Sequence, residues 1–243
     1  MYDQVTTLDY FRTLVADAAR TPLFEAAASI AQDEHPELDL QSVLSSVDQL
    51  GQQLAKRCRD VSTELKRLQA TSAFFYGELG FAGNVDGYYD PQNSYLHKVL
   101  ETRRGIPVTL ALIYIELAGI VGLNAEGIGF PGHFLVKVNL HEGPVVLDPF
   151  TGRSLSKDDI VERLGPFSKS LGLGGDAEVP IAMFLRAAST HEILLRMLRN
   201  LREIFRQQGQ AKKLKRVLER TLILDPSDEA AARLIERLGQ SNS

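Results

Sequence analysis

Three positions of this 243-residue chain follow the order of a Cys-His-Asp catalytic triad, but the first of them is a proline. Pro107 opens an apolar segment typical of a buried helix, His133 stands before a predicted strand, and Asp148 ends the next strand. In such a triad a thiolate at a helix start attacks a carbonyl group, the imidazole moves the proton, and the carboxylate orients the imidazole. Proline has no nucleophilic atom. The pattern therefore predicts the frame of a triad without cysteine chemistry.

Two other side chains are possible nucleophiles. Thr109 lies two residues after Pro107, roughly 200° around a helix, so it should point away from a cleft at position 107. Cys58 is the only cysteine, which excludes an internal disulfide and a cysteine-based metal site. Flanking cations could lower the pKa of its thiol, but it is far in sequence from His133 and Asp148. We expect neither residue to replace the missing cysteine.

Residues 80–94 form a stretch that is rich in both turn residues and aromatic residues, which predicts an ordered loop. Long loops inside compact domains are often functional, and tyrosine combines apolar area with a polar tip. The candidate binding residues are therefore Tyr88, Tyr89, Asn93, Tyr95, Thr109, His133 and Asp148. Two simpler interpretations stay open: the loop is a lid packed over the central helix, and the His133–Asp148 pair only holds two strands together.

The elements that must position these residues can be read from periodicity. Apolar residues recur at helical spacing over residues 10–79, and the run 107–117 is apolar nearly all round, as in a central buried helix. Gly122 suits a left-handed helix end. Short strands are predicted at 125–130, 134–140 and 145–147, and a helix at 154–164. The fold class is therefore α+β, with a small antiparallel sheet packed on a buried helix.

Amphipathic helices are also predicted after residue 180. They span residues 189–206, 211–224 and 229–238. They carry the strongest local charge feature of the chain, a basic cluster made of Arg196, Arg199, Arg202, Arg206, Lys212, Lys213, Lys215 and Arg216. Glutamates are interleaved with these cations, which favours a solvated helix face over a site for an acidic partner.

Composition limits the classes of function. A net charge of −4 and a pI near 5.8 argue against a nucleic-acid-binding surface. No apolar run approaches the length of a membrane span, and we expect a cytoplasmic protein with no membrane association. The histidines His35, His97 and His141 are scattered between linker, helix and turn, so no metal site and no cofactor are expected.

Several motifs resemble those of the SirB1 family, whose core belongs to the transglutaminase-like branch of the papain-like superfamily. The resemblance covers about residues 20–240, and its motifs are specific. Its sequence strings are Phe81-Ala82-Gly83-Asn84, Tyr88-Tyr89-Asp90-Pro91, Asn93-Ser94-Tyr95-Leu96, Val99-Leu100-Glu101, Arg104-Gly105-Ile106-Pro107, Gly127-Ile128-Gly129-Phe130-Pro131-Gly132-His133-Phe134-Leu135-Val136 and Leu147-Asp148-Pro149-Phe150.

The resemblance implies a register for the triad. Active members of the transglutaminase-like group open the helix with Gly-x-Cys and follow it with two spaced alanines, which Gly105, Ala111 and Ala118 match. Pro107 then occupies the cysteine position, while His133 and Asp148 match the other two members. The tail is similar to tetratricopeptide repeats, of which about one and a half fit. The implied divisions are a helical region 1–80, a core 81–180 with a possible start of the core helices near residue 20, and a repeat-like tail 181–243.

We therefore expect a pseudoenzyme, a non-catalytic transglutaminase-like protein that binds a protein or peptide at the cleft of Pro107, His133 and Asp148 or has a regulatory role. One alternative is a hydrolase or transferase that uses His133 and Asp148 with a non-cysteine nucleophile. Another is a structural adaptor that works through the repeat-like tail. The sequence leaves the partner and the oligomeric state open.

Overall fold

The computed structural model describes residues 6–167 and 181–240. Its N-terminal part is helical, as the periodicity predicts, and Asp39 starts the longest helix of this part by accepting a hydrogen bond from the amide of Gln41. None of the described helices is both long and apolar enough to cross a membrane. The helical elements before the motif region are α1 (Thr7–Leu14), α2 (Leu23–Ser29), η1 (Ile30–Asp33), α3 (Leu40–Arg57), α4 (Glu64–Ser72) and the π-helical turn η2 (Ala73–Glu78).

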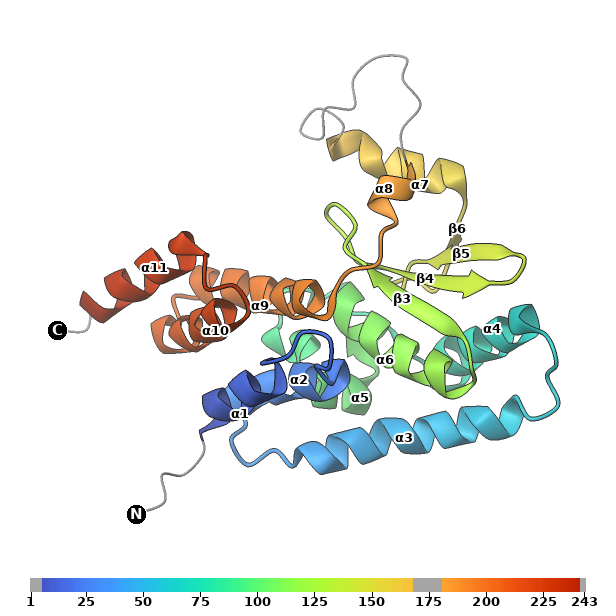
Figure 1. Cartoon of the computed structure of the whole chain (residues 1–243), viewed down its shortest axis with the longest axis horizontal. Coiled ribbons are helices and arrows are strands. Elements are labelled where there is room, and N and C mark those ends of the chain that lie inside the picture. The colour runs from blue at the N-terminus through green and yellow to red at the C-terminus, as the bar shows by residue number, and fades with distance from the viewer. Residues whose placement is uncertain (1–5, 168–180, 241–243) are drawn as a thin grey trace.

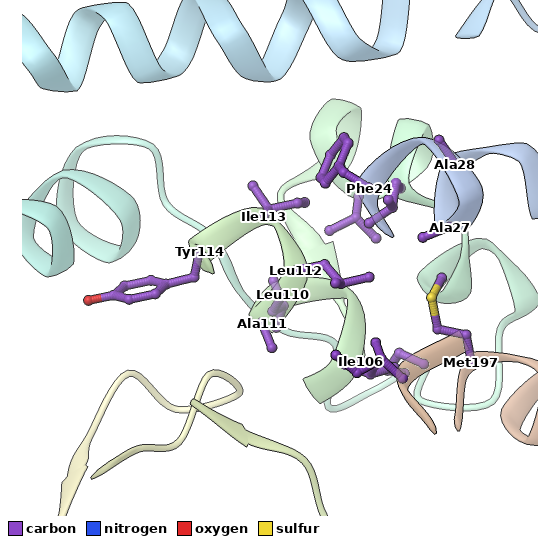
Figure 2. Packing of buried hydrophobic residues seen from close by; sticks show 14 of the residues in the cluster. Phe24, Ala27, Ala28, Ile106, Leu110, Ala111, Leu112, Ile113, Tyr114 and Met197 are labelled. Carbon is purple, nitrogen blue, oxygen red and sulfur yellow. The ribbon is translucent and has the colours of Figure 1, made fainter. Parts of the chain in front are cut away.

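Helix α6 (Pro107–Ile120) lies at the centre of the molecule. It has apolar side chains on all faces, and so it must be covered on all sides. Helix α3 packs on one side of it and strands β3 and β4 on the other, as Figure 1 shows. Figure 2 shows Leu110, Leu112 and Ile113 among side chains of α2 and α9. Gly122 ends this region at φ +74°, the predicted left-handed conformation.

One antiparallel sheet has the strand order β3-β4-β5-β6. Successive residues of β4 face opposite sides, so Val136 and Val138 join the core on α6, while Leu135 joins a second cluster beneath α7 (Lys157–Leu164) and α8 (Ile181–Phe184). Helices therefore cover both faces of the sheet (Figure 1). The strands are β3 (Asn124–Ile128), β4 (Leu135–Leu140), β5 (Gly143–Leu147) and β6 (Ser154–Leu155).

These elements confirm the predicted α+β class and correct one boundary. The periodicity assigned residues 154–164 to a helix, but Ser154 and Leu155 pair with β5 as strand β6. The helix begins only after Ser156, whose hydroxyl and amide exchange hydrogen bonds with Asp159 as a capping box. A two-residue strand has too little sequence to show a period, which is why the pattern missed it.

The predicted loop 80–94 is ordered and is tied to the start of α6. Strand β1 (Ala82–Gly83) pairs in parallel with β2 (Arg104–Gly105), directly before Pro107. Between the strands lie a short 3-10 turn, η3 (Pro91–Ser94), and helix α5 (Leu96–Thr102). The predicted division between core and tail falls at the edge of the undescribed residues 168–180 and stays a prediction.

The tail consists of α9 (Thr190–Gln207), α10 (Ala211–Leu224) and α11 (Glu229–Gln240). Helix α10 packs on α9 and α11, and α9 and α10 also pack on α2 and α1, so helices from the two halves of the chain lie side by side (Figure 1). Arg220 of α10 is fully buried at this contact. Its guanidinium donates to both carboxylate oxygens of Asp33 at 2.7 and 2.9 Å and to the carbonyl of Ser29, and it lies over the ring of Phe11.

The Arg220–Asp33 pair should therefore make a large contribution to stability. We expect Arg220→Ala to lower the free energy of unfolding by about 3–5 kcal/mol, because it leaves the Asp33 carboxylate buried without its cation. Urea unfolding followed by circular dichroism measures this loss. Arg216→Ala, which removes an exposed ion pair with Glu219 on the same helix, is the matched control and should change the value by less than about 1 kcal/mol. Equal effects of both substitutions would contradict this account.

Candidate functional site

His133 and Asp148 form a hydrogen-bonded pair at one edge of the sheet. The register of the hairpin pairs Val136 of β4 with Leu147 of β5, so the start of β4 and the end of β5 lie side by side. His133 precedes β4, and Asp148 follows β5. Their side chains meet with 2.9 Å between Nε2 and Oδ1. The structure thus brings together two of the three predicted triad positions.

Both oxygens of the Asp148 carboxylate have partners. Oδ1 accepts from the amide of Phe150 as well as from His133, and Oδ2 accepts from Nη2 of Arg163 at 2.8 Å. The side chain of Asp148 is only 2% exposed. Burial by itself would raise the pKa of Asp148, but the hydrogen bonds from His133, Phe150 and Arg163 together hold this pKa well below its usual range. Asp148 is therefore ionised at neutral pH.

Arg163 is the site residue that the sequence reasoning missed. It lies on α7, and its side chain is 35% exposed. Because Arg163 balances the charge of Asp148, the carboxylate does not require a protonated imidazole. A buried aspartate needs a cationic or hydrogen-bonding partner. The predicted helix that follows Asp148 closely in the sequence contains Arg163, and this was the signal that could have indicated it.

Pro107 is buried at the first position of α6, where its fixed φ and missing amide are readily accepted. One short segment connects this position with the pair. The amide of Gly83 donates to the carbonyl of Phe150 at 3.0 Å, and the amide of Asn84 donates to the carbonyl of Gly105 at 3.1 Å. Residues 83–84 are therefore hydrogen-bonded both to Phe150, two residues after Asp148, and to Gly105, two residues before Pro107.

The other two possible nucleophiles are engaged elsewhere. Thr109 is fully buried, and its hydroxyl accepts from the amide of Ile106 and donates toward the carbonyl of Asn93 at 2.8 Å. Thr109 thereby caps α6. Cys58 lies at the C-terminal end of α3 and is 8% exposed. Burial raises the pKa of its thiol in spite of Arg67 nearby, so the neighbouring cations do not activate it.

The candidate residues of the loop occupy different environments. Asn93 is buried, and its side chain donates to the carbonyl of Gly87 and accepts from Asn84, so it holds the loop in shape. Tyr88 packs on Phe150 with 6.0 Å between ring centroids. Tyr89 is 62% exposed. Of the candidate tyrosines, Tyr88 is the one whose ring contacts place it beside the Asp148 segment.

Tyr95 belongs to a separate aromatic cluster. It is 2% exposed and packs on His35 and His97, whose rings are 4.8 Å apart. Burial, followed by the neighbouring His35, lowers the pKa of His97 to about 4. A cavity of about 620 Å³ between α3 and α5 borders these imidazoles and contains neither His133 nor Asp148. The sequence pattern gave no sign that His35 and His97 meet, because they are far apart in the chain.

The arrangement supports proton transfer and polar binding. When Nε2 of His133 donates to Asp148, Nδ1 is left as a base, and within the described residues it has no hydrogen-bond partner. The His133 side chain is 22% exposed and so is accessible from solvent. Among residues 6–167 and 181–240, no three His, Cys, Asp or Glu side chains gather in a way that could hold a metal ion.

Comparison with known proteins agrees with this fold. A family model described as the transglutaminase-like superfamily matches residues 41–199, from α3 into α9. The chain belongs to this superfamily. More particularly, it belongs with the UPF0162 proteins: it is 36% identical to one from Xylella fastidiosa (strain Temecula1), over 89% of this chain and 76% of that protein. A UPF0162 protein of Pseudomonas aeruginosa is 34% identical over 89% of this chain and 78% of its own length.

A shorter similarity extends to eukaryotic proteins. Human F-box only protein 21 is 36% identical over 78 residues, which is 32% of this chain and 12% of that protein. No solved structure matches this chain.

The ionised Asp148 makes stability depend on pH in acid. Its folded pKa lies below the unfolded value of about 3.9, so its contribution is complete above about pH 4 and is lost as the pH falls through the folded value. We expect Asp148→Asn to lower the free energy of unfolding by about 2–3 kcal/mol at pH 7. This deficit relative to wild type should shrink below about pH 4.

Urea unfolding at a series of pH values measures both effects. The surface substitution Asp86→Asn is the matched control, since Asp86 is exposed and has no hydrogen-bond or ion-pair partner in the described part of the chain. A deficit for Asp148→Asn that stays constant from neutral to acid pH would contradict the assigned role of the carboxylate.

Proposed function

We propose that this protein is a non-catalytic member of the transglutaminase-like superfamily that binds a protein or peptide segment in the cleft of Pro107, His133 and Asp148. The observation that carries the proposal is Pro107 at the start of α6, the position that the resemblance assigns to the nucleophile, in a chain with an intact His133–Asp148 pair. Proline removes both the attacking atom and a backbone amide that could stabilise an oxyanion. The Thr109 hydroxyl is hydrogen-bonded at the start of α6 and the Cys58 thiol is buried, so neither is available as a nucleophile, which further supports the proposal.

We also propose that the protein is of the SirB1 type and that its tail is a partial tetratricopeptide-like array. Gly209 at φ +65° lies in the turn between α9 and α10, and α10 packs on both α9 and α11. So few helices cannot form an independent solenoid. They are stabilised by α1 and α2 instead, which leaves the cleft as the preferred binding site.

Restoring the cysteine tests the assignment of position 107. In a Cys58→Ala background, we expect Pro107→Cys to react with iodoacetamide at pH 6–7 at least about tenfold faster than an ordinary thiol of pKa about 8.5, because His133 would stabilise its thiolate. Mass spectrometry of the alkylated chain measures the rate.

Adding His133→Ala to this variant is the control and should remove the acceleration. If the Pro107→Cys thiol reacts at an ordinary rate, and this rate does not change when His133→Ala is added, the assignment of position 107 is wrong. Acyl transfer or proteolysis by the wild-type protein would overturn the proposal that it is non-catalytic.

Affinity capture from native lysate tests binding at the cleft. We expect one or more proteins to be retained by wild type and lost with a folded His133→Ala variant at matched concentration. Lys215→Ala, on the tail, is the matched control and should retain them. An unchanged set of captured proteins with His133→Ala, together with a loss with Lys215→Ala, would instead support an adaptor that works through the tail.

A hydrolase or transferase is the second candidate, and the intact pair with a free Nδ1 on His133 favours it. In this function His133 would activate water or a substrate hydroxyl as a general base. Turnover of an activated ester that is abolished by His133→Ala and reduced by Asp148→Asn would support it. Equal background hydrolysis by all three proteins would exclude it for such substrates.

A further inference from the structure

A pocket of about 410 Å³ lies next to the turn that carries His133. Gly129 and Pro131 of this turn form one wall, and residues of α8 and the first half of α9 form the other. Its lining is apolar where Phe134, Phe184 and Leu195 meet. A volume of this size is in the range of binding sites for small ligands and peptide side chains.

Two cations at this pocket have no anionic partner. Arg186 at its rim is paired with Glu192 at 2.6 Å, but Arg196 and Arg199 make no ion pair or hydrogen bond from their side chains within the described residues. They stand three residues apart on α9, so their guanidinium groups are neighbours on one helix face. Arg196 is also half-buried. Burial, and to a smaller extent the positive charge of Arg199, lowers the pKa of Arg196. An anion between them would relieve this repulsion.

The rest of the basic cluster differs from these two residues. Five of its eight cations have carboxylate partners: Arg202 with Asp228, Arg206 with Glu203, Lys213 with Glu34, and Lys215 and Arg216 with Glu219. Most cations of the cluster are therefore paired with carboxylates of this chain. Arg196 and Arg199 instead line a pocket that is partly apolar, whereas a nucleic-acid site would need an extended basic surface.

The pocket is connected to the cleft through Tyr88. Its ring packs on Phe150, whose amide binds the Asp148 carboxylate, and its hydroxyl is close enough to Arg196 for their charges to interact. Tyr88 therefore lies between the segment that follows Asp148 and Arg196.

We propose that this pocket binds an acidic peptide segment, with an apolar side chain against Phe134 and Leu195 and carboxylates on Arg196 and Arg199. Arginine suits this role because its planar guanidinium can bind a carboxylate through two hydrogen bonds. The inference rests on the proposed function and adds the chemical class of the partner: a segment in which acidic residues alternate with or flank apolar ones.

Selection from a library of short random peptides tests the inference, with the whole wild-type chain as bait. We expect the selected peptides to be enriched in Asp and Glu beside apolar residues. Fluorescence anisotropy of the best binder should show about tenfold weaker binding to Arg199→Gln and to Arg196→Gln, and weaker binding as NaCl rises from about 0.05 M to about 0.5 M. Arg199 is exposed, so its substitution leaves folding intact.

Arg206→Gln is the matched control, since it removes one exposed arginine from the same helix, and it should leave the affinity unchanged. The charge reversal Arg199→Glu should shift the selection toward basic peptides. Selected peptides that lack acidic residues would overturn this inference. So would acidic peptides whose affinity does not change with Arg196→Gln or Arg199→Gln. If such binders are still lost with His133→Ala, the proposed cleft function stands; if no peptide binds at all, both fail.

Discussion

Helix α6 has no polar face, and the arrangement of the molecule follows from the need to cover it. Helix α3, strands β3 and β4, and helix α9 each bury part of its surface. Its first residue, Pro107, is therefore held by packing on several sides, and the hairpin that carries His133 and Asp148 is attached to the same helix. Proline fits the first turn of a helix without strain. The fold thus accommodates proline at this position together with the His133–Asp148 pair.

The buried Asp148 carboxylate is the second constraint on the site. Arg163 and the amide of Phe150 satisfy it together with His133, so its charge does not require an imidazolium. A pair that served only to join two strands would gain nothing from solvent access. His133 nevertheless keeps an exposed edge, and its Nδ1 has no hydrogen-bond partner among the residues that the structure describes, an arrangement suited to binding a polar ligand.

The sequence predicted the α+β class, the central helix, the long strands and the meeting of His133 with Asp148, because each of these depends on local periodicity or on chain order. It could not predict Arg163, the contact of His35 with His97, or the Arg220–Asp33 pair. The last two contacts join segments that are distant in the chain, and a single sequence carries no signal for them. Arg163 is only 15 residues from Asp148, but the helical pattern of α7 does not show which of its side chains faces the carboxylate. Strand β6 was missed for a different reason: two residues are too few to show a period.

The position of α9 decides which surface of the protein is available to a partner. Helix α9 packs on α2, and α10 packs on α1, where buried Arg220 binds Asp33; most of the cations of this region already have carboxylates. The first half of α9 also borders the turn of His133, and there Arg196 has no ion-pair partner within the described part of the chain, at a partly apolar pocket. The tail thus packs on the core of the molecule through α9 and α10. Recognition is better supported where tail and core adjoin, next to the His133–Asp148 pair.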